Sequence, residues 1–283
     1  MVESSSNKAI VIMTDILILL TSFAPVFILE LIVEPRQSGF FCNDSSIRYP
    51  YKEPMIPTSY LLSFFISFPM FIISILEFSK KFFDKTLKLS RCIYSLYTTL
   101  KVFSFGFGIS TLTVEIFKIS LGNLRPHFMD VCDPKNECLN SSSDNNYIIS
   151  SDSICNPKID YDLIKKARLS FMSAHASISA FSCFFLIFYL QFRIRIKKEH
   201  ILIKPLVQYL CFILAVLVSL SRIVDHHHHW YDVLAGFLNG IIFAAFCCFA
   251  ILKYGRSHSW TLNKAENLRL NNRRHNENEK LFI

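Results

Sequence analysis

The sequence predicts an all-α, polytopic membrane protein with six transmembrane helices and a helical-bundle core. Two features of the composition indicate this class: 52% of the 283 residues are hydrophobic and only 18% are charged, whereas a soluble domain carries about 25% charged residues. A third observation is the arrangement of the apolar residues, which form blocks rather than an amphipathic repeat. In so apolar a chain, we do not interpret the net charge of +8 as a sign of nucleic-acid binding.

Six apolar blocks are long enough to be candidate spans, because about 20 residues cross the roughly 30 Å apolar core of a bilayer. They cover residues 10–33, 61–78, 102–117, 169–192, 205–221 and 233–252. The third block is short, and we expect it to extend back past Lys101, whose long side chain can reach the interface. The first contains Asp15 and precedes no small-residue cleavage site, so it is interpreted as a span rather than a signal peptide.

The loops predict which side of the membrane each end faces, since Lys and Arg are retained on the cytosolic side. Residues 79–99, 191–204 and the tail after Leu252 are basic and fall on one side of a six-span protein. We therefore expect a cytosolic N-terminus (1–9), a membrane domain (10–252) and a basic, disordered cytosolic tail (253–283). The plasma membrane is the favoured location, with the endoplasmic reticulum or Golgi as alternatives.

The opposite face carries the features of a non-cytosolic surface. Glycosylation sequons begin at Asn43 and Asn140, and both lie on this side. So do four cysteines whose pairing the sequence leaves open: Cys42, Cys132, Cys138 and Cys155. Disulfides persist in such a compartment. The sequence holds no Cys-x-x-Cys pair, and we expect neither a metal nor a cofactor.

Three polar clusters occupy the predicted non-cytosolic ends of the spans, where costly polar groups are functional candidates. They lie at 118–126, 170–177 and 221–232. Their candidate residues are Lys118, Arg125, Ser173, His175, Arg222, His228 and Asp232. Topology alone brings them to one face.

This inventory suits a phosphate monoester. Lys118, Arg125 and Arg222 can neutralise a dianion, and two imidazoles can divide the nucleophile and acid roles near neutral pH. Asp232 follows His228 by four residues, which on a helix would place both on one face and fix the imidazole tautomer. The cations supply the charge stabilisation, so the reaction needs no metal.

Each residue also has a plainer interpretation. Lys118 and Arg125 can simply anchor a helix at the lipid headgroups, and His175 can be a satisfied interfacial polar group. The histidine run 226–229 can be a solvated turn or an adventitious metal binder, and Asp232 can favour the N-terminus of the last span. These interpretations weaken when all the clusters fall on one face.

Three motifs occur in one order: Lys-x6-Arg-Pro at 118–126, Ser-Ala-His at 173–175 and Ser-Arg-x5-His-x3-Asp at 221–232. This set resembles the type 2 phosphatidic acid phosphatase superfamily. Segments 39–51, 124–132 and 167–171 are similar to the animal lipid phosphate phosphatases. The resemblance covers roughly residues 10 to 252.

The resemblance implies a six-helix core whose outward-facing active site dephosphorylates lipid phosphate monoesters without Mg²⁺. It implies that His228 is the nucleophile forming a phosphohistidine, that Asp232 orients it, and that His175 protonates the leaving alkoxide. The implied phosphate ligands are Lys118, Arg125, Ser173 and Arg222. The residues alone do not choose among the four histidines of the run, whereas the motif spacing selects His228. Phosphatidate and lysophosphatidate are the expected substrates, and self-association is left open.

Ala174 departs from the motif, because the family has Gly there. A Cβ would cost about 1 kcal/mol if the position had positive φ, but Ala is the better residue by roughly the same amount in a helix. His227 stands where the animal enzymes usually have Lys, and Tyr231 where they often have Ser.

Other functions stay open. A catalytically weak or silent relative could bind lipid phosphates or partner proteins. A channel or transporter would carry its charges near the membrane midplane, whereas these residues lie at span ends. Sphingoid-base phosphates and isoprenyl diphosphates are alternative substrates for the same enzyme class.

Overall fold

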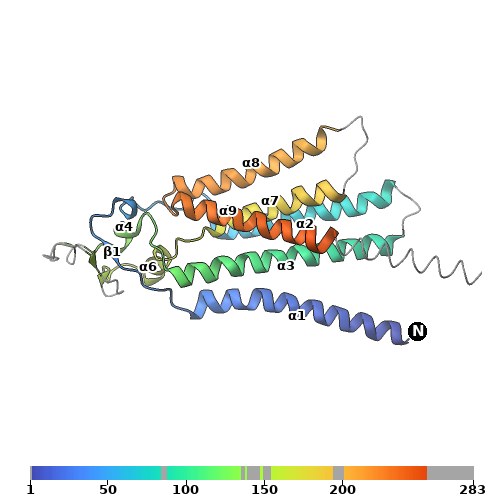
Figure 1. Ribbon diagram of the computed structural model, residues 1–283, viewed down its shortest axis with the longest axis horizontal. Helices are drawn as coiled ribbons and strands as arrows, with labels where there is room; N and C mark the ends of the chain where they lie inside the picture. The colour runs from blue at the N-terminus through green and yellow to red at the C-terminus, as the bar shows by residue number, and fades with distance from the viewer. Residues whose placement is uncertain are drawn as a thin grey trace, which may run out of the picture.

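The computed structural model describes residues 2–83, 88–134, 138, 147–148, 154–193 and 201–253. Its long helices run side by side, and the short elements gather at one end of the bundle (Figure 1). The long helices are α1 (Val2–Ile32), α2 (Thr58–Phe83), α3 (Leu89–Leu121), α7 (Ala174–Arg193), α8 (Ile203–Val224) and α9 (Trp230–Ala245), which η4 (Phe246–Lys253) continues as a π-helix. The short elements are β1 (Phe40–Phe41), η1 (Ser45–Ile47), α4 (Phe128–Cys132), β2 (Tyr147–Ile148) and α6 (Tyr161–Ala167).

Six helices in the described part of the chain are long and apolar enough to cross a membrane, which confirms the predicted number of spans. The third runs from Leu89 to Leu121, so the expected extension past Lys101 is also confirmed. The predicted start of the fourth span at residue 169 is wrong, because α7 begins at Ala174. Residues 169–173 use their backbone groups to bind other segments instead: the Ser170 amide donates to the Asn123 carbonyl at 2.9 Å.

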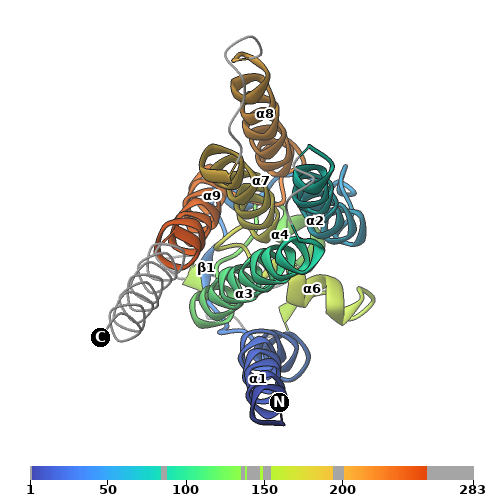
Figure 2. The same cartoon turned by 90° about the vertical axis from the view of Figure 1, so that its right-hand side faces the viewer.

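Helix α7 forms the centre of the bundle. Figure 2 shows it surrounded by α2, α3, α8 and α9, with α1 beyond α3 at the edge. An aromatic cluster joins α7 to α3, with the Phe103 ring centroid 5.5 Å from that of Phe181 and 5.1 Å from that of Phe185. The central position explains why α7 is the most buried of the spans.

Two glycines let α9 approach α7 closely. A Cβ added at Gly236 or at Gly240 would collide with the carbonyl oxygen of Ser173 or Ser177, respectively. Both positions therefore require the absence of a side chain. The close approach brings the start of α9 against the start of α7, where the Ser173 amide donates to the Asp232 carbonyl at 3.1 Å.

Several charged groups within the spans form pairs. Lys101 of α3 pairs with α1, because its Nζ lies 2.8 Å from Asp15 Oδ2. The Tyr97 hydroxyl donates to the same oxygen at 2.8 Å. Glu77 of α2 accepts hydrogen bonds from Tyr189 at 2.6 Å and from Arg193 at 3.0 Å, both on α7. An unpaired charge is expensive at this depth, so these pairs tie neighbouring helices together.

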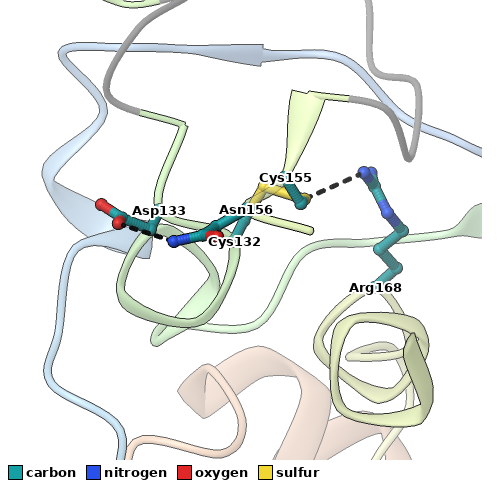
Figure 3. The surroundings of a disulfide bond; sticks show 5 residues. All are labelled: Cys132, Asp133, Cys155, Asn156 and Arg168. Carbon is teal, nitrogen blue, oxygen red and sulfur yellow. Dashed lines mark hydrogen bonds between the residues drawn. A yellow bond between two sulfur atoms is a disulfide. The ribbon is translucent and has the colours of Figure 1, made fainter. Parts of the chain in front are cut away.

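A small cap closes one end of the bundle. Strands β1 and β2 are antiparallel, with Phe40 opposite Ile148. The disulfides are Cys42–Cys138 and Cys132–Cys155, which answers the pairing that the sequence left open. Figure 3 shows the second disulfide between the Asp133–Asn156 contact and Arg168.

The two predicted glycosylation sites differ in what the structure describes. Asn43 is exposed and lies directly after Cys42. Asn140 falls outside the described residues.

Replacing Asp15 by Leu should destabilise the protein by about 2–3 kcal/mol, because Lys101 would keep its charge in the membrane without a carboxylate. Lys101→Leu should have a similar effect, and the double variant should regain most of the loss. Thermal midpoints in detergent measure this. Thr14→Leu is the control on the same helix, since the Thr14 hydroxyl bonds only the Val11 carbonyl. A double variant less stable than both single variants would contradict the pairing.

Candidate active site

The first motif lies where α3 ends. Gly122 terminates the helix, with φ of 59°, and its amide donates to the Lys118 carbonyl at 3.0 Å. An added Cβ there would collide with the Arg36 carbonyl oxygen, so both the conformation and the space require glycine. The chain then turns across the end of the bundle and carries Arg125 away from the α3 axis.

The second motif is docked onto the first by main-chain hydrogen bonds. The Arg125 amide donates to the Ala167 carbonyl at 2.8 Å, and the Ser170 amide donates to Asn123 at 2.9 Å. Arg125 Nε also donates to the Leu169 carbonyl at 3.4 Å. The side chain of Arg125 is thereby anchored to the segment that precedes α7.

The third motif is a tight loop between α8 and α9. The Arg222 carbonyl accepts the amides of His227 at 3.1 Å and His228 at 3.3 Å, and His226 takes a left-handed φ of 58°. This turn folds His228 back into the protein, where its side chain is 4% exposed. Helix α9 begins only at Trp230.

The predicted helical contact between His228 and Asp232 is therefore wrong in its geometry, because His228 precedes the helix. The two side chains still face each other, with His228 Nδ1 3.8 Å from Asp232 Oδ2. Asp232 is held in the first turn of α9 by the His229 amide, which donates to its Oδ2 at 3.0 Å. Within the described residues neither ring nitrogen of His228 makes a hydrogen bond, but Nδ1 is buried and faces Asp232, so Nε2 is the nitrogen available to a ligand.

The predicted phosphate ligands already have partners. Lys118 Nζ is 2.7 Å from Glu115 Oε1, and Arg222 Nη2 is 2.9 Å from Asp225 Oδ2. Glu115 and Asp225 were not singled out from the sequence, although each lies three residues from its basic partner, a spacing that favours pairing on a helix. Ser173 is fully buried, and its Oγ accepts the Ala176 amide at 3.4 Å.

His175 stands in the first turn of α7, within electrostatic range of Lys118, Arg222 and His228. Its Nε2 donates to the Ile56 carbonyl at 3.1 Å. This contact fixes the ring. Among the described residues, Nδ1 is the ring nitrogen of His175 without a hydrogen-bond partner.

Residues 49–57 run from the cap to the start of α2 and cover the site. The Met55 amide donates to Asp225 Oδ2 at 3.0 Å. His227 Nε2 donates to the Lys52 carbonyl at 3.0 Å, and the Tyr49 ring stacks on His226 with centroids 4.6 Å apart. This segment, which no sequence motif linked to the site, therefore contacts the third motif at several points.

Comparison with known proteins identifies the family. Residues 99–256 match the PAP2 superfamily. The chain is 33% identical to phospholipid phosphatase 1 of Mus musculus over 257 residues, 89% of this chain and 88% of the relative. It is 33% identical to phospholipid phosphatase 2 of Homo sapiens over 244 residues, 84% of this chain and 82% of the relative. The chain belongs to the PAP2 superfamily. No solved structure matches it.

The Ala174 departure from the motif is compatible with the backbone of this PAP2 protein. Among the described residues, the non-glycine positions with positive φ are Asp133 and His226. Ala174 is not one of them and begins α7, so its conformation does not require glycine.

Burial keeps His227 and His228 neutral. It lowers the pKa of His228 to about 4, with Asp232 opposing the shift and Arg125 adding to it. Burial and Arg125 lower the pKa of His227 to about 3. Arg125, whose pKa burial and Arg222 lower to about 10, stays protonated at neutral pH. His228 therefore presents an unprotonated nitrogen beside a cation.

The contacts of His227 agree with a neutral ring. Its Nδ1 lies 3.2 Å from Arg125 Nη1, and because arginine only donates, Nδ1 accepts and Nε2 carries the proton. Across the described residues, no group of three or more His, Cys, Asp or Glu side chains is arranged to hold a metal ion.

The neutral histidines should make this PAP2 protein sensitive to acid. A lowered folded-state pKa stabilises the fold above the ordinary histidine pKa of about 6.5, and this stabilisation is lost as pH falls toward the folded-state value. For His227 that value is about 3. Thermal midpoints in detergent should therefore fall below pH 6.5, and His227→Gln should show a shallower fall. An unchanged pH dependence in the variant would contradict a neutral His227.

Proposed function

We propose that this chain is an integral membrane lipid phosphate phosphatase that hydrolyses phosphatidate, lysophosphatidate and related monoesters through a phosphohistidine, without Mg²⁺. The observation that carries the proposal is the neutral, enclosed His228 beside Asp232, with Lys118 and Arg125 acting on its charge state. This nucleophile lies at one end of an apolar bundle, within reach of a lipid headgroup. The relatives named phospholipid phosphatases support the choice of a phospholipid substrate.

In the first step, His228 Nε2 attacks the phosphorus atom and the bond from phosphorus to the ester oxygen breaks. Asp232 faces the opposite nitrogen at 3.8 Å and stabilises the positive charge that develops on the ring. This contact should shorten as the charge appears, since such hydrogen bonds are often long before substrate binds. Lys118, Arg125 and Arg222, together with the Ser173 hydroxyl, hold the non-bridging phosphate oxygens.

The leaving group needs a proton, because an alkoxide is a poor leaving group. His175 supplies it in its protonated, imidazolium form, through Nδ1, and the resulting neutral ring then accepts a proton from the water that attacks the phosphohistidine. This second step breaks the bond between phosphorus and nitrogen, releases inorganic phosphate, and restores neutral His228 and protonated His175. One water is consumed for each ester hydrolysed, and no external cofactor is required.

Glu115 and Asp225 position the basic side chains of Lys118 and Arg222 before substrate binds. Each carboxylate occupies one donor of a basic side chain. Arg222 Nε also donates to the Ser221 hydroxyl at 3.1 Å, and the remaining donors are left for the phosphate dianion. An arginine offers five donors in a planar fork, so Arg222 can bind Asp225 and phosphate together. The carboxylates thus limit the desolvation cost of keeping these cations buried without substrate.

The site should face away from the cytosol, because the basic segments lie at the other ends of the spans and Asn43 lies on the capped end. In sealed microsomes, whose outer surface is cytosolic, an endoglycosidase-sensitive shift should disappear in the Asn43→Gln/Asn140→Gln double variant. Added protease should remove an epitope fused after Ile283. A protected epitope together with absent glycans would overturn this orientation.

Purified protein should release phosphate from phosphatidate and lysophosphatidate in EDTA, because its own cations supply the charge stabilisation. A panel that adds sphingoid-base phosphates and an isoprenyl diphosphate measures the substrate preference. The control is His228→Ala purified in parallel. Activity that requires added Mg²⁺ would contradict the mechanism, and binding of lipid phosphate without turnover would favour the silent-relative alternative.

The two histidines should separate by leaving group. His228→Ala should abolish turnover on every ester, since it removes the nucleophile. His175→Ala should lose about 10²–10⁴-fold on a lipid phosphate but far less on an activated aryl phosphate, which departs without a proton. Steady-state rates on both substrates measure this. Equal losses in His175→Ala would rule out the acid role, and an inactive His229→Ala beside an active His228→Ala would select the other histidine.

A further inference from the structure

Ser170 is a fully buried polar residue that the proposed mechanism does not use. It precedes the second motif by three residues, in the segment that joins α6 to α7. Its hydroxyl lies 2.5 Å from Asp232 Oδ2, and its amide donates to the Asn123 carbonyl at 2.9 Å. Ser170 therefore connects the chain after α3 directly with the carboxylate of the third motif.

The Asp232 carboxylate is held unevenly. Its Oδ2 receives the Ser170 hydroxyl, the His229 amide at 3.0 Å and the His229 ring at 3.3 Å, while His228 Nδ1 lies 3.8 Å away. Its Oδ1 is buried and has no hydrogen-bond partner among the described residues. Two neighbouring histidines thus share one oxygen, and the orientation of the carboxylate decides which of them it serves.

The contacts with His229 are local, because both residues belong to the start of α9. These local contacts do not by themselves turn the Asp232 carboxylate toward His228. Among the described residues, Ser170 is the side chain from another part of the fold that hydrogen-bonds this carboxylate. The direction of the bond is fixed, since an ionised carboxylate only accepts and the serine hydroxyl must donate.

We propose that Ser170 is a positioning residue for the phosphatase reaction: its hydroxyl holds Asp232 Oδ2 toward His228, so that Asp232 can stabilise the ring when His228 attacks. The proposal rests on the proposed function. In this proposal Ser170 acts through Asp232 and does not contact the phosphate. Its loss should therefore lower kcat while leaving KM and inhibition by inorganic phosphate nearly unchanged.

Ser170→Ala should reduce kcat about 10–100-fold, because a hydrogen bond to a charged group is lost. The reduction should be similar for a lipid phosphate and an activated aryl phosphate, unlike that of His175→Ala, since nucleophile attack is common to both. Ser170→Thr keeps the hydroxyl and should retain most of the activity. Ser170→Cys fills the same space with a slightly larger atom but offers only a weak donor, so it should resemble Ser170→Ala.

Ser179→Ala is the matched control. Ser179 is also fully buried, but its hydroxyl donates only to the Ala176 carbonyl, at 3.2 Å. This variant should keep wild-type kcat. A loss in Ser170→Ala that Ser179→Ala shares, or that Ser170→Cys restores through volume alone, would overturn the proposal in favour of a packing role.

A double-mutant cycle isolates the coupling. In an Asp232→Ala background, Ser170→Ala should change the aryl phosphate rate less than about 2-fold, against about 10–100-fold in the parent. Equal effects in both backgrounds would show that Ser170 does not act through Asp232. If the Asp232→Ala rate is undetectable, the kcat values of the Ser170 variants decide the question: the proposal requires Ser170→Thr to be faster than both Ser170→Cys and Ser170→Ala. A parent enzyme without phosphatase activity would instead refute the proposed function, whereas an active parent with unaffected Ser170 variants refutes only this inference.

Discussion

The structure depends on one constraint: a charge inside an apolar bundle must have a partner within hydrogen-bond reach, because lipid cannot solvate it. The pairs satisfying it are Asp15–Lys101, Glu77–Arg193, Glu115–Lys118 and Asp225–Arg222. The first two join different helices and stabilise the bundle. The last two lie at the capped end and hold basic side chains that the proposed mechanism assigns to phosphate. The same rule thus operates in the scaffold and in the site.

The site is assembled around the segment that precedes α7. Its carbonyl and amide groups bind the chain after α3, and its Ser170 and Ser173 reach Asp232 at the start of α9. Because α7 is packed on several sides, this segment has little freedom to move. Because the segment before α7 is buried and fixed, residues from three separate helix ends can meet at defined distances.

Burial also prepares the chemistry. A histidine exposed to water has a pKa of about 6.5, so a large part of it would be protonated in mildly acidic surroundings and unable to attack. Enclosure lowers the pKa of His228 to about 4, which keeps its lone pair available. Asp232 opposes this shift, and the balance between enclosure and carboxylate suits the role proposed for His228, a nucleophile that is neutral before attack and charged after it.

The sequence by itself determined the number and order of the spans, because a hydrophobic block of sufficient length is a local property. Motif spacing likewise selected the candidate residues that the structure brings to one end of the bundle, although their roles stay predictions. Tertiary structure alone decided that α7 begins at Ala174, that Cys42 pairs with Cys138, and that Ser170 reaches Asp232. Each depends on contacts between residues far apart in the chain, which no local pattern encodes.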